Sequence, residues 1–301
     1  MATSVFNAPQ FQNEAAAFAF VESQLWPNGP VCPHCGEAKR TGRLNGKTTR
    51  LGLHKCYACR KPFTVRIGTI FEDSHLALHL WLQIIHLMCA SKKGISTRQI
   101  QRMLDCSMTT AWFLGHRIRE AMMDTGSPIG GDGQTVEADE TFLSKSAKTR
   151  RKVPLSAKSG VTVVSLVERG GPIRSISLDD NSIGVKLTVR QHLAEGSRLV
   201  TDGANHFKCL TRNHESVDHS RKEYVRGDVH VNTLEGFFSV FKRGLVGVYQ
   251  HMDKRHLDRY LSEFDFRMNN REKLGIDDTQ RVAIALKGFV GKRLTYKATE
   301  G

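Results

Sequence analysis

Residues 135–142 read Thr-Val-Glu-Ala-Asp-Glu-Thr-Phe. The β-branched and aromatic residues of this run predict a short strand, but two acidic residues, Asp139 and Glu140, lie in its middle, where β-propensity disfavours aspartate. Successive side chains of a strand point to opposite faces of the sheet. We therefore expect only one of these two carboxylates to line any site to which the strand contributes.

Further acidic residues lie in two later elements. Residues 199–203, Leu-Val-Thr-Asp-Gly, end an apolar strand in Asp202, and residues 230–243 open a helix with Asn232 and Glu235 three residues apart on one face. Each acidic residue alone has an ordinary structural explanation, such as a turn, an edge-strand charge or a solvated helix position. Together, two strand-borne aspartates and one helix-borne glutamate supply the hard oxygen ligands of a two-metal phosphoryl-transfer site with Mg²⁺ or Mn²⁺.

The surrounding sequence predicts an α/β domain over residues 134–271. The β-rich runs are 135–142, 161–167, 172–178 and 198–202, and the helical runs are 183–193, 231–243 and 253–269. Residues 127–133, Ser-Pro-Ile-Gly-Gly-Asp-Gly, predict a linker on the N-terminal side of this domain. Residues 272–301 show no clear pattern, and we treat them as a C-terminal tail.

Two Cys-x-x-Cys pairs lie nearer the N-terminus, Cys32-Pro-His-Cys35 and Cys56-Tyr-Ala-Cys59, with twenty residues between them. Two such turns aim four thiolates at one point, which is the tetrahedral ligand set of structural Zn²⁺. A pair of disulfides is disfavoured in a reducing cytoplasm, and a redox motif would need only one pair. We therefore predict a zinc ribbon over residues 31–74, preceded by an N-terminal helix within residues 1–30.

The helical sequence of residues 75–127 contains a candidate helix-turn-helix. Residues 96–105 begin with a hydroxyl capping residue, a hydroxyl-rich turn follows, and residues 111–122 predict a second helix. We place Ile100, Met103, Leu104, Trp112, Ile118 and Met122 inside, and we expect exposed arginines for DNA contact at Arg98, Arg102, Arg117 and Arg119. An ordinary helical hairpin has much the same pattern, so plain packing is the alternative.

The composition favours a nucleic-acid partner. The chain of 301 residues has 44 Lys and Arg against 30 Asp and Glu, a net charge of +14, and residues 1–130 and 131–301 each carry +7. An excess of this size, spread through folded sequence, is typical of proteins that bind a polyanion. The longest apolar run, residues 76–90, is interrupted by histidine and glutamine, which argues against a membrane span. The N-terminus resembles no targeting signal, and we expect a cytoplasmic protein.

These motifs, taken in order, resemble a known family. The resemblance is carried by the two cysteine pairs, TIFEDSH (69–75), STRQIQRML (96–104), AWFLGHRIR (111–119), VEADETF (136–142), VTDGAN (200–205), HVNTLEGFFSVFKRGLVGVYQHM (230–252) and HLDRYLSEFDFRMNNR (256–271). They are similar to the zinc-ribbon transposases of the bacterial insertion sequence 1595 family, in the DDE superfamily. The resemblance spans residues 26–271 and implies a ribonuclease-H-like mixed sheet, its first three strands antiparallel, flanked by helices.

The resemblance also implies an activity and assigns residues to it. The activity is cleavage of donor DNA by water at the element's ends, followed by attack of the freed 3′-hydroxyl on target DNA. Asp139 and Asp202 match the first and second acidic residues, and Glu140 remains a second candidate on the first strand. Family members carry Glu or Asn at the third position. We prefer Glu235, because a carboxylate is the better metal ligand, and keep Asn232 as a neutral ligand or neighbouring contact.

Basic residues near the acidic ones are candidates for DNA contact. Lys242, seven positions after Glu235, matches the superfamily's DNA-contacting basic residue, and Arg243 follows it. Residues 144–152 form either a phosphate-contacting loop or a solvated hairpin, and the candidates there are Lys148, Arg150 and Arg151. The implied partners are the element's terminal inverted repeats and target DNA, bound by a homodimer or larger oligomer in the bacterial nucleoid. The alternatives are a non-catalytic DNA-binding regulator and a nuclease that never joins strands.

Overall fold

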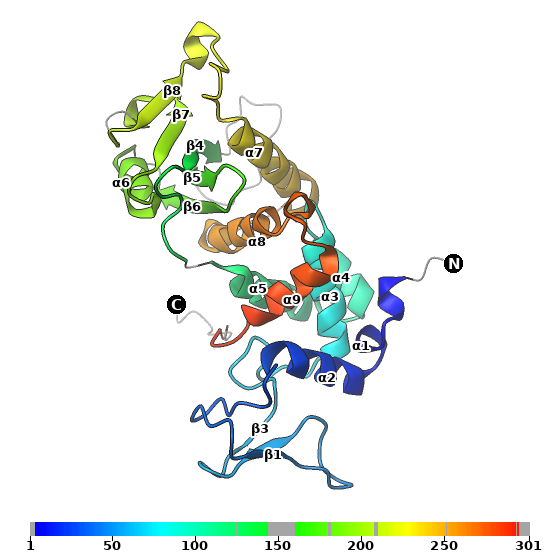
Figure 1. The fold of residues 1–301 in the computed structure, drawn as a ribbon. Helices are drawn as coiled ribbons and strands as arrows, with labels where there is room; N and C mark the ends of the chain where they lie inside the picture. Colours follow the sequence, from blue (N-terminus) through cyan, green and yellow to red (C-terminus); the bar gives the residue numbers. More distant parts are fainter. Residues whose placement is uncertain are drawn as a thin grey trace, which may run out of the picture. The chain divides into compact units, whose positions relative to one another are not determined.

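The computed structural model describes residues 4–124, 126–143, 160–179, 182–207, 210–250, 252–292 and 294. The chain divides into two compact units, which we describe separately (Figure 1). Unit 1 consists of residues 1–91, 97–122 and 276–301, and unit 2 consists of residues 92–96 and 123–275. The C-terminal end of the chain therefore belongs to the same unit as the N-terminal end.

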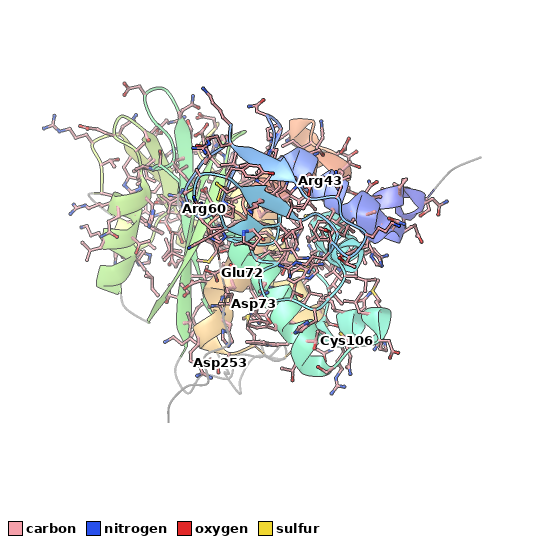
Figure 2. The ribbon with its side chains drawn as sticks, turned by 90° about the horizontal axis from the view of Figure 1, so that it is seen from below. Arg43, Arg60, Glu72, Asp73, Cys106 and Asp253 are labelled. Atoms are coloured by element: carbon pink, nitrogen blue, oxygen red, sulfur yellow. The ribbon has the colours of Figure 1, made fainter. Side chains whose placement is uncertain are left out.

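The ribbon of unit 1 is a three-stranded antiparallel sheet. Strand β2 (His54–Cys56) lies between β1 (Thr41–Arg43) and β3 (Pro62–Phe63). Its small core consists of the buried Cys32, Cys56 and Phe63, with the partly buried Trp26, Cys59 and Ile67 packed against them. Arg43 and Arg60 are exposed on this ribbon (Figure 2). A core of this size is too small to stabilise the ribbon by itself.

Unit 1 contains several helices, of which α3 (Leu78–Ala90) is the most apolar. They are the 3₁₀ turn Val5–Asn7, α1 (Pro9–Gln12), α2 (Glu14–Leu25), α3 (Leu78–Ala90), α4 (Thr97–Leu104), α5 (Met108–Met122) and α9 (Asp278–Lys287). α2 begins after Asn13, whose side-chain oxygen caps the helix by accepting hydrogen bonds from the N–H groups of Ala15 and Ala16. This is the helix that the sequence predicts within residues 1–30. The apolar α3 packs against α1, α2 and α9.

Residues 272–301 are not a featureless tail. They contain a 3₁₀ turn (Glu272–Leu274) and helix α9, which belongs to unit 1. Asp277 and Gln280 form a capping box at the start of α9, and Arg281 donates a hydrogen bond to the carbonyl oxygen of Cys89 at 2.8 Å. Our expectation of a tail missed this helix, which is short and whose packing partner lies 192 residues earlier in the chain.

Unit 2 contains a mixed sheet of five strands in the part of the chain that the structure describes. The strands are β4 (Thr135–Leu143), β5 (Val161–Glu168), β6 (Ile173–Asp179), β7 (Arg198–Asp202) and β8 (His214–Val217), in the spatial order β6-β5-β4-β7-β8. β4, β5 and β6 pair antiparallel, whereas β7 is parallel to β4 and β8 is parallel to β7. This confirms the mixed sheet that the resemblance implied. The sequence pattern did not reveal β8, because its four residues include one apolar side chain.

Helices cover both faces of this sheet (Figure 1). On one face, α7 (Asn232–Gly244) and α8 (Leu257–Asn269) pack phenylalanine, leucine and tyrosine side chains against β5. On the other face, α6 (Ser182–His192) packs Val185 and Val189 against β4, β5 and β7. The shorter turns are the 3₁₀ segments Asn205–Phe207, His219–Arg221 and Lys254–His256 and the π-helical segment Leu245–Tyr249. Among the described residues, no helix is both long and apolar enough to cross a membrane.

Candidate active site and zinc site

Three carboxylates of unit 2 converge where β4 passes the end of β7. The parallel pairing of these strands runs as far as Ala138 opposite Thr201, and the next residues are Asp139 on β4 and Asp202 at the end of β7. Carboxylate oxygens of Asp139, Glu140 and Asp202 all lie within 4.8 Å of one another. The sheet thus brings together residues that are far apart in the sequence.

The expectation that only one of Asp139 and Glu140 lines the site was wrong. The two side chains leave β4 on opposite sides, and Glu140 shares its side with Ala138, which packs against α6. However, the pairing of β4 with β7 ends at Ala138, so this edge of β4 is not paired with β7 beyond that residue, and the carboxylates of Asp139 and Glu140 both come within 4.8 Å of that of Asp202. The Asp139 carboxylate bends along β4, where it accepts a hydrogen bond from the N–H of Glu140 (2.8 Å).

His206 lies beside this cluster, and the sequence pattern did not single it out. It lies in the 3₁₀ turn after β7, with its Nε2 atom 3.0 Å from Oε2 of Glu140. Between the end of β7 and this turn, the Asp202 carboxylate accepts a hydrogen bond from the N–H of Ala204 (3.2 Å). The feature of the sequence that could have pointed to His206 is its position four residues after Asp202. The His206 ring thus approaches the Glu140 carboxylate from the segment that follows β7.

The crowding of like charges changes the pKa of the central carboxyl group. Burial, and then the neighbouring carboxylates of Asp202, Glu140 and Glu235, raise the pKa of Asp139 to about 7. Burial also raises the pKa of Glu140, against the lowering effect of His206. A divalent cation would relieve this repulsion. Oxygens bound to one Mg²⁺ lie up to about 4.2 Å apart, so these residues fit such an ion with little movement.

Helix α7 carries the predicted third ligand. Asn232 and Glu235 lie in its first turn, and both are exposed. The Glu235 carboxylate contributes to the raised pKa of Asp139, so the two groups are within electrostatic range, although Glu235 lies outside the group that meets within 4.8 Å. Its carboxylate therefore has to move inward to share a cation with Asp139. The preference for Glu235 over Asn232 stays a prediction.

The raised pKa of Asp139 predicts a pH effect on the protein without a divalent cation. Its pKa is about 7 in the folded protein against 3.8 ordinarily, so Asp139 adds stability at low pH that is lost as the pH rises from about 4 to about 7. We expect unit 2 to open more readily at pH 8 than at pH 5, by up to about 3 kcal/mol, because about two pH units separate pH 5 from the folded pKa. The measurement is hydrogen exchange of the β4 and β7 amides, corrected for intrinsic rates, without added Mg²⁺ or Mn²⁺.

Asp139→Asn is the control for this effect, because the amide does not titrate. In this variant, most of the difference in stability between pH 5 and pH 8 should disappear. At pH 8 the variant should be more stable than the wild-type protein. If wild-type and variant proteins show the same pH dependence, the proton is not held by Asp139.

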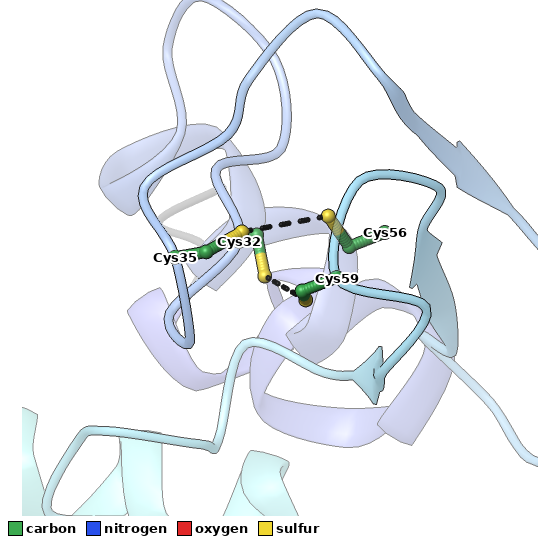
Figure 3. A group of neighbouring side chains, drawn as sticks. All are labelled: Cys32, Cys35, Cys56 and Cys59. Atoms are coloured by element: carbon green, nitrogen blue, oxygen red, sulfur yellow. Dashed lines mark hydrogen bonds between the residues drawn. The ribbon is translucent and has the colours of Figure 1, made fainter.

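The four predicted zinc ligands converge in unit 1 (Figure 3). The sulfur atoms of Cys32 and Cys59 lie 3.7 Å apart, as do those of Cys35 and Cys56, and all four lie within 4.8 Å of one another. Thiolates bound tetrahedrally at ~2.3 Å from Zn²⁺ are ~3.8 Å apart. The cluster therefore already has the dimensions of a Zn(Cys)₄ site, and the exposed Arg60 beside it offsets part of the negative charge of such a site.

Helices α4 and α5 pack against each other across the turn of residues 105–107. The Ser107 hydroxyl accepts a hydrogen bond from the N–H of Thr110 (3.1 Å) and so caps the start of α5. Arg98 and Arg102 are exposed on α4, as predicted. The two helices have the order and the turn expected of a helix-turn-helix, and their role in DNA recognition stays a prediction.

Arg117 and Arg119 do not project into solvent, so the predicted exposure on which their DNA contact rested was wrong. Their exposed fractions are 6% and 1%. Arg117 donates hydrogen bonds to the carbonyl oxygens of Ile70 (2.8 Å) and Glu72 (2.7 Å). Other parts of unit 1 surround α5, so backbone carbonyls, rather than DNA phosphates, satisfy the guanidinium group of Arg117. On α4, by contrast, Met103 was predicted inside and is 49% exposed.

The remaining basic candidates are two residues of α7 and three residues that follow β4 in the sequence. Lys242 and Arg243 are in the last turn of α7, Lys242 partly buried and Arg243 exposed. Their contact with DNA stays a prediction. Lys148, Arg150 and Arg151 lie outside the described residues, and the role predicted for them is likewise untested.

Comparison with known proteins agrees with this geometry. Residues 130–269 match the ISXO2-like transposase domain, and residues 12–62 match the transposase zinc-ribbon domain. The chain is 27% identical, over 286 residues, to an uncharacterized protein in the transposable element ISH50 of Halobacterium salinarum; the match covers 88% of this chain and 94% of that protein. No solved structure is significantly similar to the chain.

A zinc ribbon joined in one chain to a mixed-sheet domain with converging carboxylates defines a transposase of the DDE class. The chain belongs to the insertion sequence 1595 family of zinc-ribbon transposases. The resemblance seen in the sequence is thereby confirmed.

Proposed function

We propose that this transposase, as a homodimer or larger oligomer, binds the ends of a bacterial insertion sequence, cleaves DNA there and joins the freed 3′-hydroxyl ends to target DNA. The convergence of Asp139, Glu140 and Asp202 at the end of β7 carries the proposal. Cleavage and joining are both in-line displacements at phosphorus, in which the attacking and leaving oxygens must be held and their charge neutralised.

The residues of the site have separate tasks in this proposal. Asp139 and Asp202, together with Glu140 and either Glu235 or Asn232, hold two divalent cations. When bound, these ions neutralise charge on the phosphate and make the attacking oxygen more acidic. Adjacent parallel strands carry the two aspartates, so the sheet keeps their separation constant through both chemical steps.

The basic residues bring DNA to this negatively charged site. Without cations the three carboxylates repel phosphate, so attraction must come from elsewhere on the chain. The net charge of +14 supplies it, and exposed arginines lie on the ribbon (Arg43, Arg60) and on α4 (Arg98, Arg102). In this proposal the ribbon and the α4–α5 pair hold the element end, while Lys242 and Arg243 contact the strand to be cut.

A joining assay tests the proposed function. The purified zinc-loaded protein is incubated with Mg²⁺ or Mn²⁺, a target plasmid and a duplex that carries the inverted repeat flanking the coding sequence. We expect nicking of the intact duplex and joining of a duplex whose 3′ end is already cut. Binding without either reaction would support a non-catalytic regulator, and nicking without joining would support a nuclease.

The exposed arginines of α4 give a prediction for DNA binding. In Arg98→Ala/Arg102→Ala, affinity for the end duplex should fall, and the slope of log K against log salt should become shallower by about 2. Each arginine that neutralises one phosphate releases about one counterion on binding. The measurement is fluorescence anisotropy of a labelled end duplex at several salt concentrations.

Lys287→Ala is the control for this double variant. Lys287 is exposed on α9, in the same unit, and is not among the predicted DNA contacts. Its removal should leave the slope nearly unchanged. Equal slopes for wild-type protein and the α4 double variant would exclude α4 as a DNA-contacting helix.

A further inference from the structure

Glu137 is a buried glutamate of β4 to which the proposed reaction assigns no task. It lies two residues before Asp139, so both side chains leave the strand on the same side. Its exposed fraction is 0%. A buried carboxylate is stable only where several donors replace its lost hydration. The donors around Glu137 come from two separate parts of unit 2.

The first donors belong to the N-terminus of α7. Glu137 Oε2 accepts a hydrogen bond from the N–H of Thr233, and Oε1 accepts one from the Thr233 hydroxyl, both at 3.0 Å. The helix has no side-chain cap of its own, because its N-cap residue is Val231. Glu137 therefore caps α7 from the neighbouring strand, and its negative charge faces the positive end of the helix dipole.

The second donor is Arg169, at the end of β5. Its Nε atom donates to Glu137 Oε1 (2.9 Å), and its Nη2 atom donates to the carbonyl oxygen of His230 (2.9 Å), two residues before α7. The Arg169 N–H donates to the carbonyl oxygen of Thr135 on β4 (3.0 Å). Arg169 thus joins β4, the end of β5 and the chain entering α7 in one hydrogen-bonded network.

Protein donors occupy both oxygens of Glu137, which distinguishes it from Asp139. Glu137 is therefore poorly suited to bind a cation itself. Its contacts instead determine where the first turn of α7 lies against β4. Asn232 and Glu235, the two candidates for the third ligand, are in that turn on either side of Thr233.

We propose that Glu137 is a positioning residue, which holds the first turn of α7, and with it Asn232 and Glu235, at the point along β4 where Asp139 binds a divalent cation. The inference rests on the proposed metal-dependent function of this site. Ligands must be held within about 0.5 Å of their working geometry. A helix carrying one of them therefore needs an anchor on the strand that carries another.

The experiment measures Mn²⁺ binding to the full zinc-loaded chain by calorimetry, without DNA. Glu137→Gln keeps the shape of the side chain but removes its charge and one acceptor. It should weaken Mn²⁺ affinity about 10- to 100-fold, the usual cost of losing a residue that orients metal ligands. Thr233→Val removes only the hydroxyl donor and should cause a smaller loss, which keeps the test decisive if Glu137→Gln folds poorly.

A double-mutant cycle asks whether Glu137 acts through α7. The effect of Glu137→Gln is measured again in Glu235→Gln and in Asn232→Ala. In the variant that has already lost the third ligand, Glu137→Gln should change Mn²⁺ affinity by less than about twofold. The reason is that the effects of substitutions at residues that act together do not add. An effect of full size in both backgrounds would overturn the positioning role.

Glu263→Gln is the matched control. Glu263 is also 0% exposed and is paired with Arg267 and the hydroxyl of Tyr249, away from β4 on α8. The variant should lower thermal stability, as Glu137→Gln does, but leave Mn²⁺ affinity unchanged.

Unchanged Mn²⁺ affinity in a folded Glu137→Gln protein would also overturn the inference. If wild-type protein binds Mn²⁺ but cuts no DNA, the proposed function fails, and the binding data still decide the role of Glu137.

Discussion

Asp139→Ala and Asp202→Ala should each lower Mg²⁺-dependent cleavage of element-end DNA by roughly 10³-fold, a loss typical of removing a main electrostatic stabiliser of a transition state. Each substitution removes one of the carboxylates that converge at the end of β7. The arginines of unit 1 are unaltered, so affinity for the end duplex should be retained. Cleavage is measured as single-turnover nicking of a labelled duplex, and binding is measured by anisotropy.

Glu195→Ala is the control for these variants. Glu195 is an exposed carboxylate of the same unit, in the turn before β7 and outside the cluster. Its removal should leave the cleavage rate within about twofold of wild type, since a solvated surface charge contributes little. Full activity in Asp139→Ala or in Asp202→Ala would remove that residue from the mechanism.

Cys56→Ser should unfold the ribbon and abolish end binding. Cys56 and Cys32 are predicted zinc ligands and also two of the three buried residues of the ribbon's core, so little remains to hold these strands together without the metal. Zinc contributes about 10–16 kcal/mol to the folding of comparable small sites. The measurements are zinc content per chain, amide dispersion of the ribbon in NMR spectra, and affinity for the end duplex.

Cys106→Ser controls for the loss of a thiol as such. Cys106 is half-buried and lies outside the four-cysteine cluster. This variant should keep one zinc per chain and an ordered ribbon. A Cys56→Ser protein that also keeps one zinc and an ordered ribbon would show that the metal is not bound by this cluster.

Short-range patterns were enough to predict much of this protein. Two Cys-x-x-Cys pairs predicted four converging sulfurs because each pair already forms a turn with both thiols on one side. Alternating β-rich and helical runs predicted the main elements of unit 2 apart from β8. Asp139 and Asp202 were predicted because acidic residues are unusual in apolar strands. The mixed sheet with its first three strands antiparallel followed from the family resemblance rather than from these patterns, and the structure gave the order of the strands.

Long-range packing explains what could not be predicted. Nothing near Arg117 in the sequence shows that the carbonyl oxygens of Ile70 and Glu72 will bind its guanidinium group. Helix α9 also depends on a partner 192 residues away. In both cases the deciding contact joins segments that have no relation in local sequence, so local periodicity carries no information about it.

The sequence by itself was enough to predict the four converging cysteines, the family of the catalytic domain and two of the clustered acidic residues, because spacing and residue type are local properties. Only the tertiary structure decided that Glu140 joins Asp139 at one site, since this depends on where β7 ends beside β4. The tertiary structure also decided that Glu137 caps α7, because a strand residue can cap a helix only when folding places the two in contact.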